Sequence, residues 1–111
     1  MEMQADNELE YQTRMEGSKG VIVVDGDLAN EQSGEALRKA FNQMFGNGTR
    51  TIVMDLSNVQ IINSYGIGKI LMCYKRLKAE GGVLMVKPLT GFVKDTFELL
   101  MLDSLFPVDS E

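Results

Sequence analysis

Apolar residues change their spacing several times along the chain, and each spacing predicts a different element. In residues 9–17 apolar and polar positions alternate, which is typical of a half-exposed strand, with one face formed by Leu9, Tyr11, Thr13 and Met15. Residues 20–26 are a run of β-branched side chains that predicts a buried strand. The short turn at residues 16–19 joins the two strands, so we expect a hairpin.

Three further segments have the spacing of an amphipathic helix. In residues 28–48 one helical face holds Ala36, Leu37, Ala40, Phe41, Met44 and Phe45. Asn30 or Ser33 is placed to cap this helix, and Gly46 to end it. The second helix is expected to end near residues 79–82, and its apolar face holds Ile67, Ile70, Leu71, Tyr74 and Leu77. The third helix has an apolar face made of Val93, Phe97, Leu100 and Met101.

Further strands are predicted between and after these helices. Residues 50–57 predict a buried strand that closes in a turn at Asp55 and Ser57, and residues 83–87 predict another, broken by Pro88. Residues 105–108 predict a short closing strand or extended segment. Because buried strands alternate with helices, parallel pairing through right-handed crossovers is expected.

The resulting order is β-β-α-β-α-β-α, with a short strand at the end. We therefore expect an α/β fold, with a mixed, mainly parallel sheet, an N-terminal hairpin and helices packed on the sheet. One domain is expected over residues 1–111, in which residues 1–8 form a flexible N-terminus.

The amino-acid composition excludes several classes of function. The chain has 16 acidic and 11 basic residues, a net charge of −5. This balance argues against binding to nucleic acids or to an anionic membrane surface, because both need a basic face. Histidine is absent, which removes the commonest general base and the commonest metal ligand. Cys73 is the single cysteine, so no intrachain disulfide is possible, and we expect it to be a small core residue rather than a redox switch.

The N-terminus and the apolar runs bear on location. Residues 1–10 are acidic and lack the apolar segment of a signal peptide. No apolar run approaches the ~20 residues that span a membrane. A cytoplasmic protein is therefore expected.

Residues 61–71 hold the candidate chemistry, because Asn63 and Ser64 lie between a buried strand and a helical pattern. The glycines of "GIGK" do not complete a phosphate-binding loop: Asn63 stands where that motif needs Gly, and Ile70 where it needs Ser or Thr. Ser64 is also a poor hydrolytic nucleophile, because Ile62 replaces the glycine of the elbow motif and no histidine is present to activate the hydroxyl. Ser64 is instead predicted to cap the helix that follows.

Gly66 and Gly68 make this segment unusual. Each glycine in the first helical turn costs about 1 kcal/mol relative to alanine. They make sense where another backbone or a partner surface comes close, unless the regular helix begins only near Lys69. The segment follows a buried strand, at the end of the sheet where open α/β folds carry functional loops.

The stretch "TIVMDLSNVQIINSYGIGKIL" at residues 51–71 resembles the STAS domain family of anti-sigma factor antagonists. That family's signature is a buried strand, Asp-Leu-Ser, and later Asp-Ser-Ser-Gly-Leu-Gly, which corresponds here to residues 63–68. "VDGDL" at residues 24–28 is similar to the family's turn before the first helix. "FELLMLDSLFPVDS" at residues 97–110 is similar to its closing helix and strand. The resemblance covers nearly the whole chain from Leu9.

The resemblance implies a function without catalysis by the domain itself and without a cofactor of its own. In the family, the serine after the aspartate accepts a phosphoryl group from an anti-sigma factor that is also a serine kinase, which supplies ATP and Mg²⁺; here that serine is Ser64. A serine phosphatase is the implied opposing partner. Asn63 and Tyr65 depart from the pattern, since Asp and a second Ser or Thr are usual there. The implied kinase-facing surface is made of Asp25, Asp27, Asn63, Ser64, Tyr65, Gly66 and Gly68.

Two points stay open on the sequence. Asp25 and Asp27 flank Gly26, so they belong either to the partner-facing surface or merely to turn chemistry. The chain is expected to be a partner switch controlled by phosphorylation of Ser64. The alternative is a constitutive STAS subunit of a larger regulatory or transport complex that is never phosphorylated.

Overall fold

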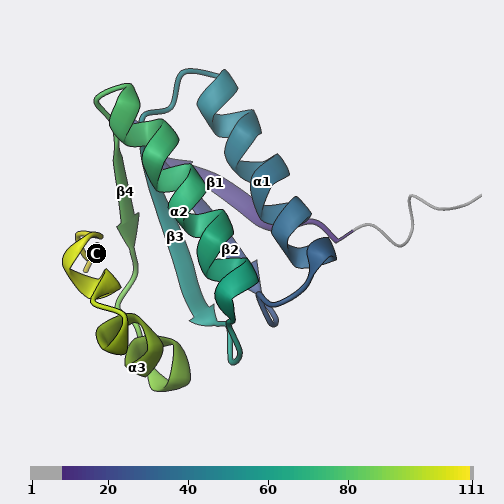
Figure 1. The fold of residues 1–111 in the computed structure, drawn as a ribbon. Coiled ribbons are helices and arrows are strands. Elements are labelled where there is room, and N and C mark those ends of the chain that lie inside the picture. The colour runs from purple at the N-terminus through teal and green to yellow at the C-terminus, as the bar shows by residue number, and fades with distance from the viewer. Residues whose placement is uncertain (1–8, 111) are drawn as a thin grey trace, which may run out of the picture.

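The computed structural model describes residues 9–110 and shows a four-stranded sheet in the order β1-β2-β3-β4 (Figure 1). β1 pairs antiparallel with β2, whereas β2–β3 and β3–β4 pair in parallel. The bounds of the strands are Gln12–Glu16 for β1, Lys19–Asp25 for β2, Thr51–Asn58 for β3 and Val83–Val86 for β4. The predicted hairpin and α/β fold are confirmed. The flexible segment expected at residues 1–8 lies outside the described residues.

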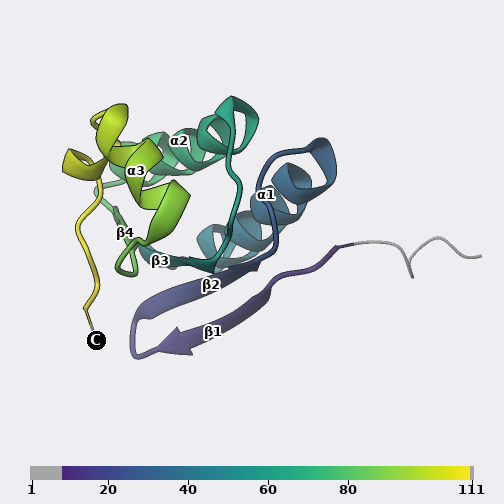
Figure 2. The ribbon, with the colours of Figure 1, turned by 90° about the horizontal axis from the view of Figure 1, so that it is seen from below.

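Three α-helices lie on one side of the sheet (Figure 2). Their bounds are Glu31–Gly46 for α1, Ser64–Ala79 for α2 and Gly91–Leu99 for α3, and a short 3₁₀ helix, η2, spans Leu102–Ser104. α1 and α2 run side by side over the sheet, while α3 lies near the end of β4 (Figure 1). None of the helices in residues 9–110 combines the length and the apolarity that crossing a membrane demands.

The core fills the space between the helices and the sheet. Its fully buried side chains come from every layer and include Ile22, Leu37, Phe41, Ile52, Met54, Leu77 and Phe97. α1 starts with a capping box: the Ser33 N–H donates to Asn30 Oδ1 at 2.9 Å, and the Asn30 N–H donates to Ser33 Oγ at 3.2 Å. Both residues that the sequence offered as caps therefore act together.

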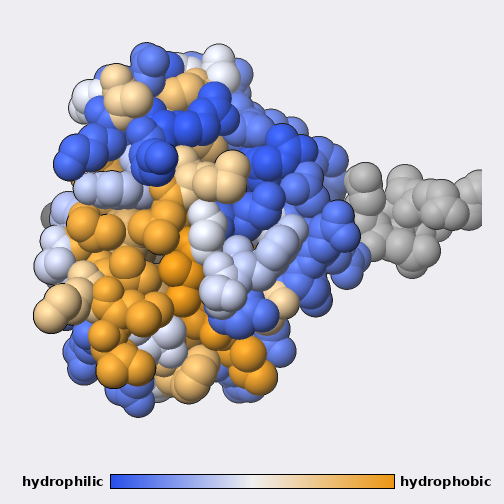
Figure 3. Space-filling view, viewed as in Figure 1, coloured by the Kyte–Doolittle hydropathy of each residue, from blue (hydrophilic) through white to orange (hydrophobic). Residues whose placement is uncertain are grey.

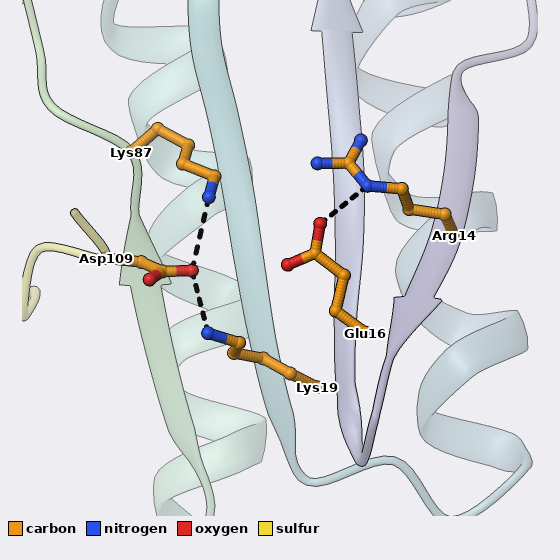
Figure 4. Close-up of polar contacts among 5 residues, drawn as sticks. All are labelled: Arg14, Glu16, Lys19, Lys87 and Asp109. Atoms are coloured by element: carbon orange, nitrogen blue, oxygen red, sulfur yellow. Dashed lines mark hydrogen bonds and ion pairs between the residues drawn. The ribbon is translucent and has the colours of Figure 1, made fainter. Parts of the chain in front are cut away.

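The opposite face of the sheet carries ion pairs among long polar side chains. Figure 4 shows the Asp109 carboxylate between two ammonium groups, with Lys19 at 3.1 Å and Lys87 at 3.4 Å. Arg14 pairs with Glu16 at 2.7 Å on the same face. Asp109 is buried, so these lysines compensate its charge and hold the C-terminal segment to the sheet.

The closing segment extends the sheet by a short parallel bridge between Val86 and Val108. The Val86 N–H donates to the Pro107 carbonyl at 3.0 Å, and the Asp109 N–H donates to the Val86 carbonyl at 2.8 Å. The extended ending predicted for residues 105–108 is confirmed at Val108, whereas Leu105 and Phe106 lie in the turn that follows η2.

Two predictions about strands were wrong in part. The apolar face predicted for residues 9–17 is buried only at its start, where Tyr11 is buried and Leu9 packs against the core. Every residue of β1 itself is exposed, Met15 at 52%, and β1 is the edge strand of the sheet. Asp55 and Ser57 do not close β3 in a turn, since the strand continues to Asn58. The Asp55 carboxylate accepts from the Ser57 N–H at 3.0 Å and from its hydroxyl at 2.7 Å, so their local pairing does not interrupt the strand.

The predicted apolar face of the third helix is only half correct. Val93 and Phe97 are buried, but Leu100 is 51% and Met101 77% exposed. The helix ends at Leu99, and the chain reverses at Met101, whose φ of 60° lies in the left-handed region. Periodicity alone therefore extended the predicted apolar face past Leu99, the last residue of α3, to Leu100 and Met101.

Candidate functional site

The loop before α1 and the loop before α2 lie side by side at the carboxyl ends of the parallel strands. Leu28 and Ile62 form a parallel bridge, and the Leu28 N–H donates to the Ile61 carbonyl at 2.9 Å. Nearer the strands, the Gly26 N–H donates to the Asn58 carbonyl at 3.2 Å. The structure thus brings residues 25–30 next to the start of α2.

Asn63, not Ser64, caps α2. Its backbone is extended, and its Oδ1 accepts from the N–H groups of Tyr65 at 3.0 Å and of Gly66 at 3.2 Å. The Asn63 Nδ2 donates to the Ala29 carbonyl at 3.0 Å, which ties the helix start to the neighbouring loop. The prediction that Ser64 is the cap is wrong because asparagine is as good a cap as serine and stands one residue earlier.

Ser64 is the first residue of α2 and is exposed. Within residues 9–110 its hydroxyl has no hydrogen-bond partner, since the cap is supplied by Asn63. A reagent or protein can therefore reach this oxygen without breaking a contact that holds the helix.

The two glycines play different parts. Gly66 is buried, and a Cβ built on it would lie 2.1 Å from the Leu28 carbonyl oxygen, so it lets α2 approach the chain's own backbone. A Cβ on Gly68 would meet nothing within 4 Å. Of the two reasons expected for these glycines, the close approach of another backbone is confirmed at Gly66, which corrects its assignment to the partner surface, while Gly68 remains a candidate for that surface. The helix also begins at Ser64, so the idea that it starts only near Lys69 was wrong.

Tyr65 is partly exposed, at 38%, and packs on α1. Its ring lies over Gly34, where an added Cβ would come within 2.6 Å of the ring. The Lys69 ammonium lies 5.5 Å from the ring centroid. Gly34 belongs to none of the predicted motifs, although a glycine inside a helix is itself a sign of close packing.

The exposed members of the predicted surface are drawn from the end of one strand, two loops and one helix. Asp25 is the exposed last residue of β2, and Asp27 is exposed in the loop that follows. Asn63, Ser64 and Tyr65 are exposed at the start of α2. The hydrogen bond from Asn63 to Ala29 joins the two segments. The loop that contains Asp27 therefore lies next to the start of α2.

Neither a reactive thiol nor a metal centre accompanies this surface. Burial raises the pKa of the Cys73 thiol to about 12, although Arg76 and Lys69 act in the opposite direction. Cys73 is thus a core residue that stays protonated, as expected. In the part of the chain that the structure describes, no three His, Cys, Asp or Glu side chains gather where they could hold a metal ion.

Comparisons with known proteins agree with this fold. The family model described as "Mlab, STAS domain" matches residues 11–107. BtrV of Bordetella bronchiseptica, a candidate anti-sigma factor antagonist, is 30% identical over 81 residues, which is 73% of this chain and 70% of BtrV.

Solved structures match over most of the chain. A candidate anti-sigma factor antagonist from Thermotoga maritima has a TM-score of 0.80 at 19% identity, covering 88% of this chain and 84% of its own. The anti-sigma factor antagonist SpoIIAA matches in its unphosphorylated form, with a TM-score of 0.70 at 19% identity over 91% of this chain and 89% of SpoIIAA. The phosphorylated form of SpoIIAA from Bacillus matches with a TM-score of 0.71 at 20% identity, over 91% of this chain and 92% of SpoIIAA.

Proposed function

Because this chain belongs to the STAS domain family, we propose that it is a partner-switching regulator of the anti-sigma factor antagonist type. In this proposal the unmodified chain binds an anti-sigma factor that is also a serine kinase, and phosphorylation of Ser64 releases it. One observation carries the proposal: the Ser64 hydroxyl is exposed and unbonded at the start of α2, at the position of the family's acceptor serine.

The chemistry belongs to the partner. Ser64 Oγ attacks the γ-phosphorus of ATP, the bond to the β,γ-bridging oxygen breaks, ADP leaves, and the hydroxyl proton passes to a base of the kinase. The kinase supplies Mg²⁺ and the positioning, so the chain acts as substrate and regulator and not as an enzyme. A serine phosphatase would reverse the modification.

The fold is expected to survive the modification. The Ser64 hydroxyl takes no part in the helix cap, so a phosphate displaces no hydrogen bond of the cap. The positive end of the helix favours a dianion, by ~0.3–1 kcal/mol per charge near the first turn. Likeness to both forms of SpoIIAA, with TM-scores of 0.70 and 0.71, supports a fold that tolerates either state.

The interface is where the phosphate acts. A phosphoserine carries about −2 charge and would face a partner surface fitted to a neutral hydroxyl. Asp25 ends β2 and Asp27 lies in the loop that adjoins the start of α2, so the phosphate adds to charge of the same sign. Release of the partner follows from repulsion and desolvation rather than from unfolding.

Asn63 gives the departure from the family pattern a structural reason. Its Nδ2 donates to the Ala29 carbonyl, and a carboxylate at this position has no proton to donate. With asparagine in place of the family's usual aspartate, this position lacks a negative charge but gains a hydrogen bond to the neighbouring loop. This exchange is the one observation that favours the second candidate, a constitutive STAS subunit that is never phosphorylated.

The decisive experiment is intact-mass analysis after incubation with the anti-sigma factor-type kinase of the same organism and ATP. We expect a gain of about 80 Da, one phosphoryl group, in the wild type and none in Ser64→Ala. Pull-down should recover the partner with wild type and Ser64→Ala but not with Ser64→Asp. Equal recovery of all three, with no mass gain, would establish the constitutive subunit instead. Cytoplasmic location and a single domain over residues 1–111 are part of the same proposal.

A further inference from the structure

Positive charge is concentrated on α2, although the chain is acidic overall. The helix carries Lys69, Lys75, Arg76 and Lys78 and no acidic residue, whereas the whole chain has a net charge of −5. Arg76 and Lys78 lie in the last turn, where positive charge also stabilises the helix. The separation of charge on the molecule favours a partner of opposite sign on this side.

Two of these cations border a groove of about 250 Å³ between α1 and α2. Arg38, Lys69 and Arg76 line it, and its apolar lining is supplied by Phe41, Met72 and Cys73. Figure 3 shows the region of α1 and upper α2 as mainly hydrophilic, while hydrophobic residues gather over α3 and the neighbouring side of α2. The groove is thus an apolar slot with cationic edges.

The cations of the groove outnumber its acids. Glu35 is shared between Arg38 at 2.8 Å and Lys69 at 3.4 Å. Within residues 9–110 Arg76 has no carboxylate partner, and its guanidinium donates to the Asn42 side chain. Three cations and one carboxylate leave an excess of positive charge.

The site is held in shape before any partner arrives. The Arg76 guanidinium lies 4.5 Å from the ring centroid of Phe45 and 5.7 Å from that of Phe41, which orients it. The Lys69 side chain is only 18% exposed beside Tyr65 and Glu35, so its position is also restricted. Met72, at 53% exposure, offers an adaptable apolar contact at the rim.

We propose that the groove binds an acidic amphipathic helix of a partner protein. One apolar side chain of that helix enters the slot over Phe41 and Cys73, and its flanking carboxylates pair with Arg38 and Arg76. The inference rests on the proposed function in one respect: Ser64 begins the same helix, so the partner that contacts Ser64 is expected to carry the acidic helix. A phosphate on Ser64 would then repel that acidic segment as well.

The test uses the whole chain, labelled with ¹⁵N, and two synthetic helical peptides of about four turns. The first has leucines at i and i+4 flanked by glutamates, and the second has lysine in place of every glutamate. We expect the acidic peptide to shift the amide signals of Arg38, Lys69, Met72 and Arg76, and the basic peptide to shift none of them. Binding should weaken as salt is added.

Matched variants separate the groove from general charge. Arg38→Glu with Arg76→Glu reverses two charges in the groove, and Lys75→Glu with Lys78→Glu reverses two on α2 outside its lining. The groove variant should bind the acidic peptide at least tenfold more weakly, about 1.4 kcal/mol, and the control within about twofold of wild type. Should the groove variant not fold, Arg76→Gln alone, with Lys75→Gln as its control, is measured in the same way.

Several outcomes overturn the inference: no binding of either peptide, equal binding of both, or equal loss in the two variants. Concentration-dependent shifts of the same amides in the chain alone would show that a second copy occupies the groove, which also overturns it. The proposed function fails separately. A chain that binds the acidic peptide but never gains a phosphoryl group refutes the switch alone, and a phosphorylated chain with an inactive groove refutes this inference alone.

Discussion

Gly66→Ala and Gly68→Ala place the same methyl group two residues apart on α2 and are expected to have opposite effects. A Cβ added at Gly66 would lie 2.1 Å from the Leu28 carbonyl oxygen, whereas a Cβ added at Gly68 would meet nothing within 4 Å. Both substitutions improve helix propensity by about 1 kcal/mol. The difference between them therefore measures the contact between α2 and the loop before α1.

The size of the effect follows from that contact. To relieve it, α2 and the loop must separate by about 1 Å, against the bonds from Asn63 to Ala29 and from Leu28 to Ile61. Overpacking of this kind costs typically 1–3 kcal/mol, and the upper end is expected because the obstacle is backbone. We expect a net loss of about 2 kcal/mol for Gly66→Ala and a gain of up to about 1 kcal/mol for Gly68→Ala.

Thermal unfolding followed by circular dichroism measures the difference. At roughly 4 °C per kcal/mol for a domain of this size, the two variants should melt about 12 °C apart. Amide signals of residues 25–30 should move in Gly66→Ala and stay in place in Gly68→Ala. A Gly66→Ala variant that melts at or above the wild-type temperature would refute the close packing of α2 on Leu28.

Four further outcomes are expected. Asn63→Ala removes the cap and the bond to Ala29 and should cost about 1–2 kcal/mol in urea unfolding, more than Ser64→Ala; the reverse order would contradict the cap assignment. Gly68→Leu should fold normally yet bind the kinase at least tenfold more weakly by calorimetry, about 1.4 kcal/mol, and normal binding would place the interface elsewhere. Burial raises the pKa of the Cys73 thiol from 9.0 to about 12, so the unfolded chain loses this proton at lower pH than the folded chain. The free energy of unfolding of the wild type should therefore fall by about 1.4 kcal/mol per pH unit above pH 9, relative to that of Cys73→Ala. Met101→Gly should stabilise the fold by up to about 1 kcal/mol and so raise the melting temperature, because the backbone φ of Met101 is 60° and glycine adopts this angle without strain. An unchanged or lower melting temperature would show that contacts of the Met101 side chain compensate the strain.

Local periodicity was enough to predict the order of elements and most of the core. The β-branched run of residues 20–26 became β2, and the apolar faces of the first two helices pack on the sheet. These features depend on which neighbouring residues need burial, and that information lies within a few residues of each position. The ends of elements were less well predicted, as Leu100 and Met101 show, because a helix end is decided by what the next segment packs against.

Some features of the candidate site could likewise be predicted from the sequence, and others could not. The order of residues 63–68 and the likeness of three motifs to one family could be found in the sequence. The likeness implied a surface shared by Ser64, Asp25 and Asp27, but a simple turn at Asp25 and Asp27 stayed open. Only the tertiary structure decided that Asn63 is the cap, since that depends on backbone angles and on a bond to Ala29, which is distant in sequence.

The same is true of the glycines and the groove. Gly66 and Gly68 look alike in sequence, yet one is pressed against the Leu28 carbonyl and the other is open, because only one side of α2 meets the neighbouring loop. Arg38 and Arg76 are far apart in the chain and border one groove because α1 and α2 pack side by side. The sequence by itself determined which residues need burial and which motif they carry. The packing of segments distant along the chain decided which atoms meet at the surface, since each such contact depends on the relative placement of two elements and not on the local pattern of either.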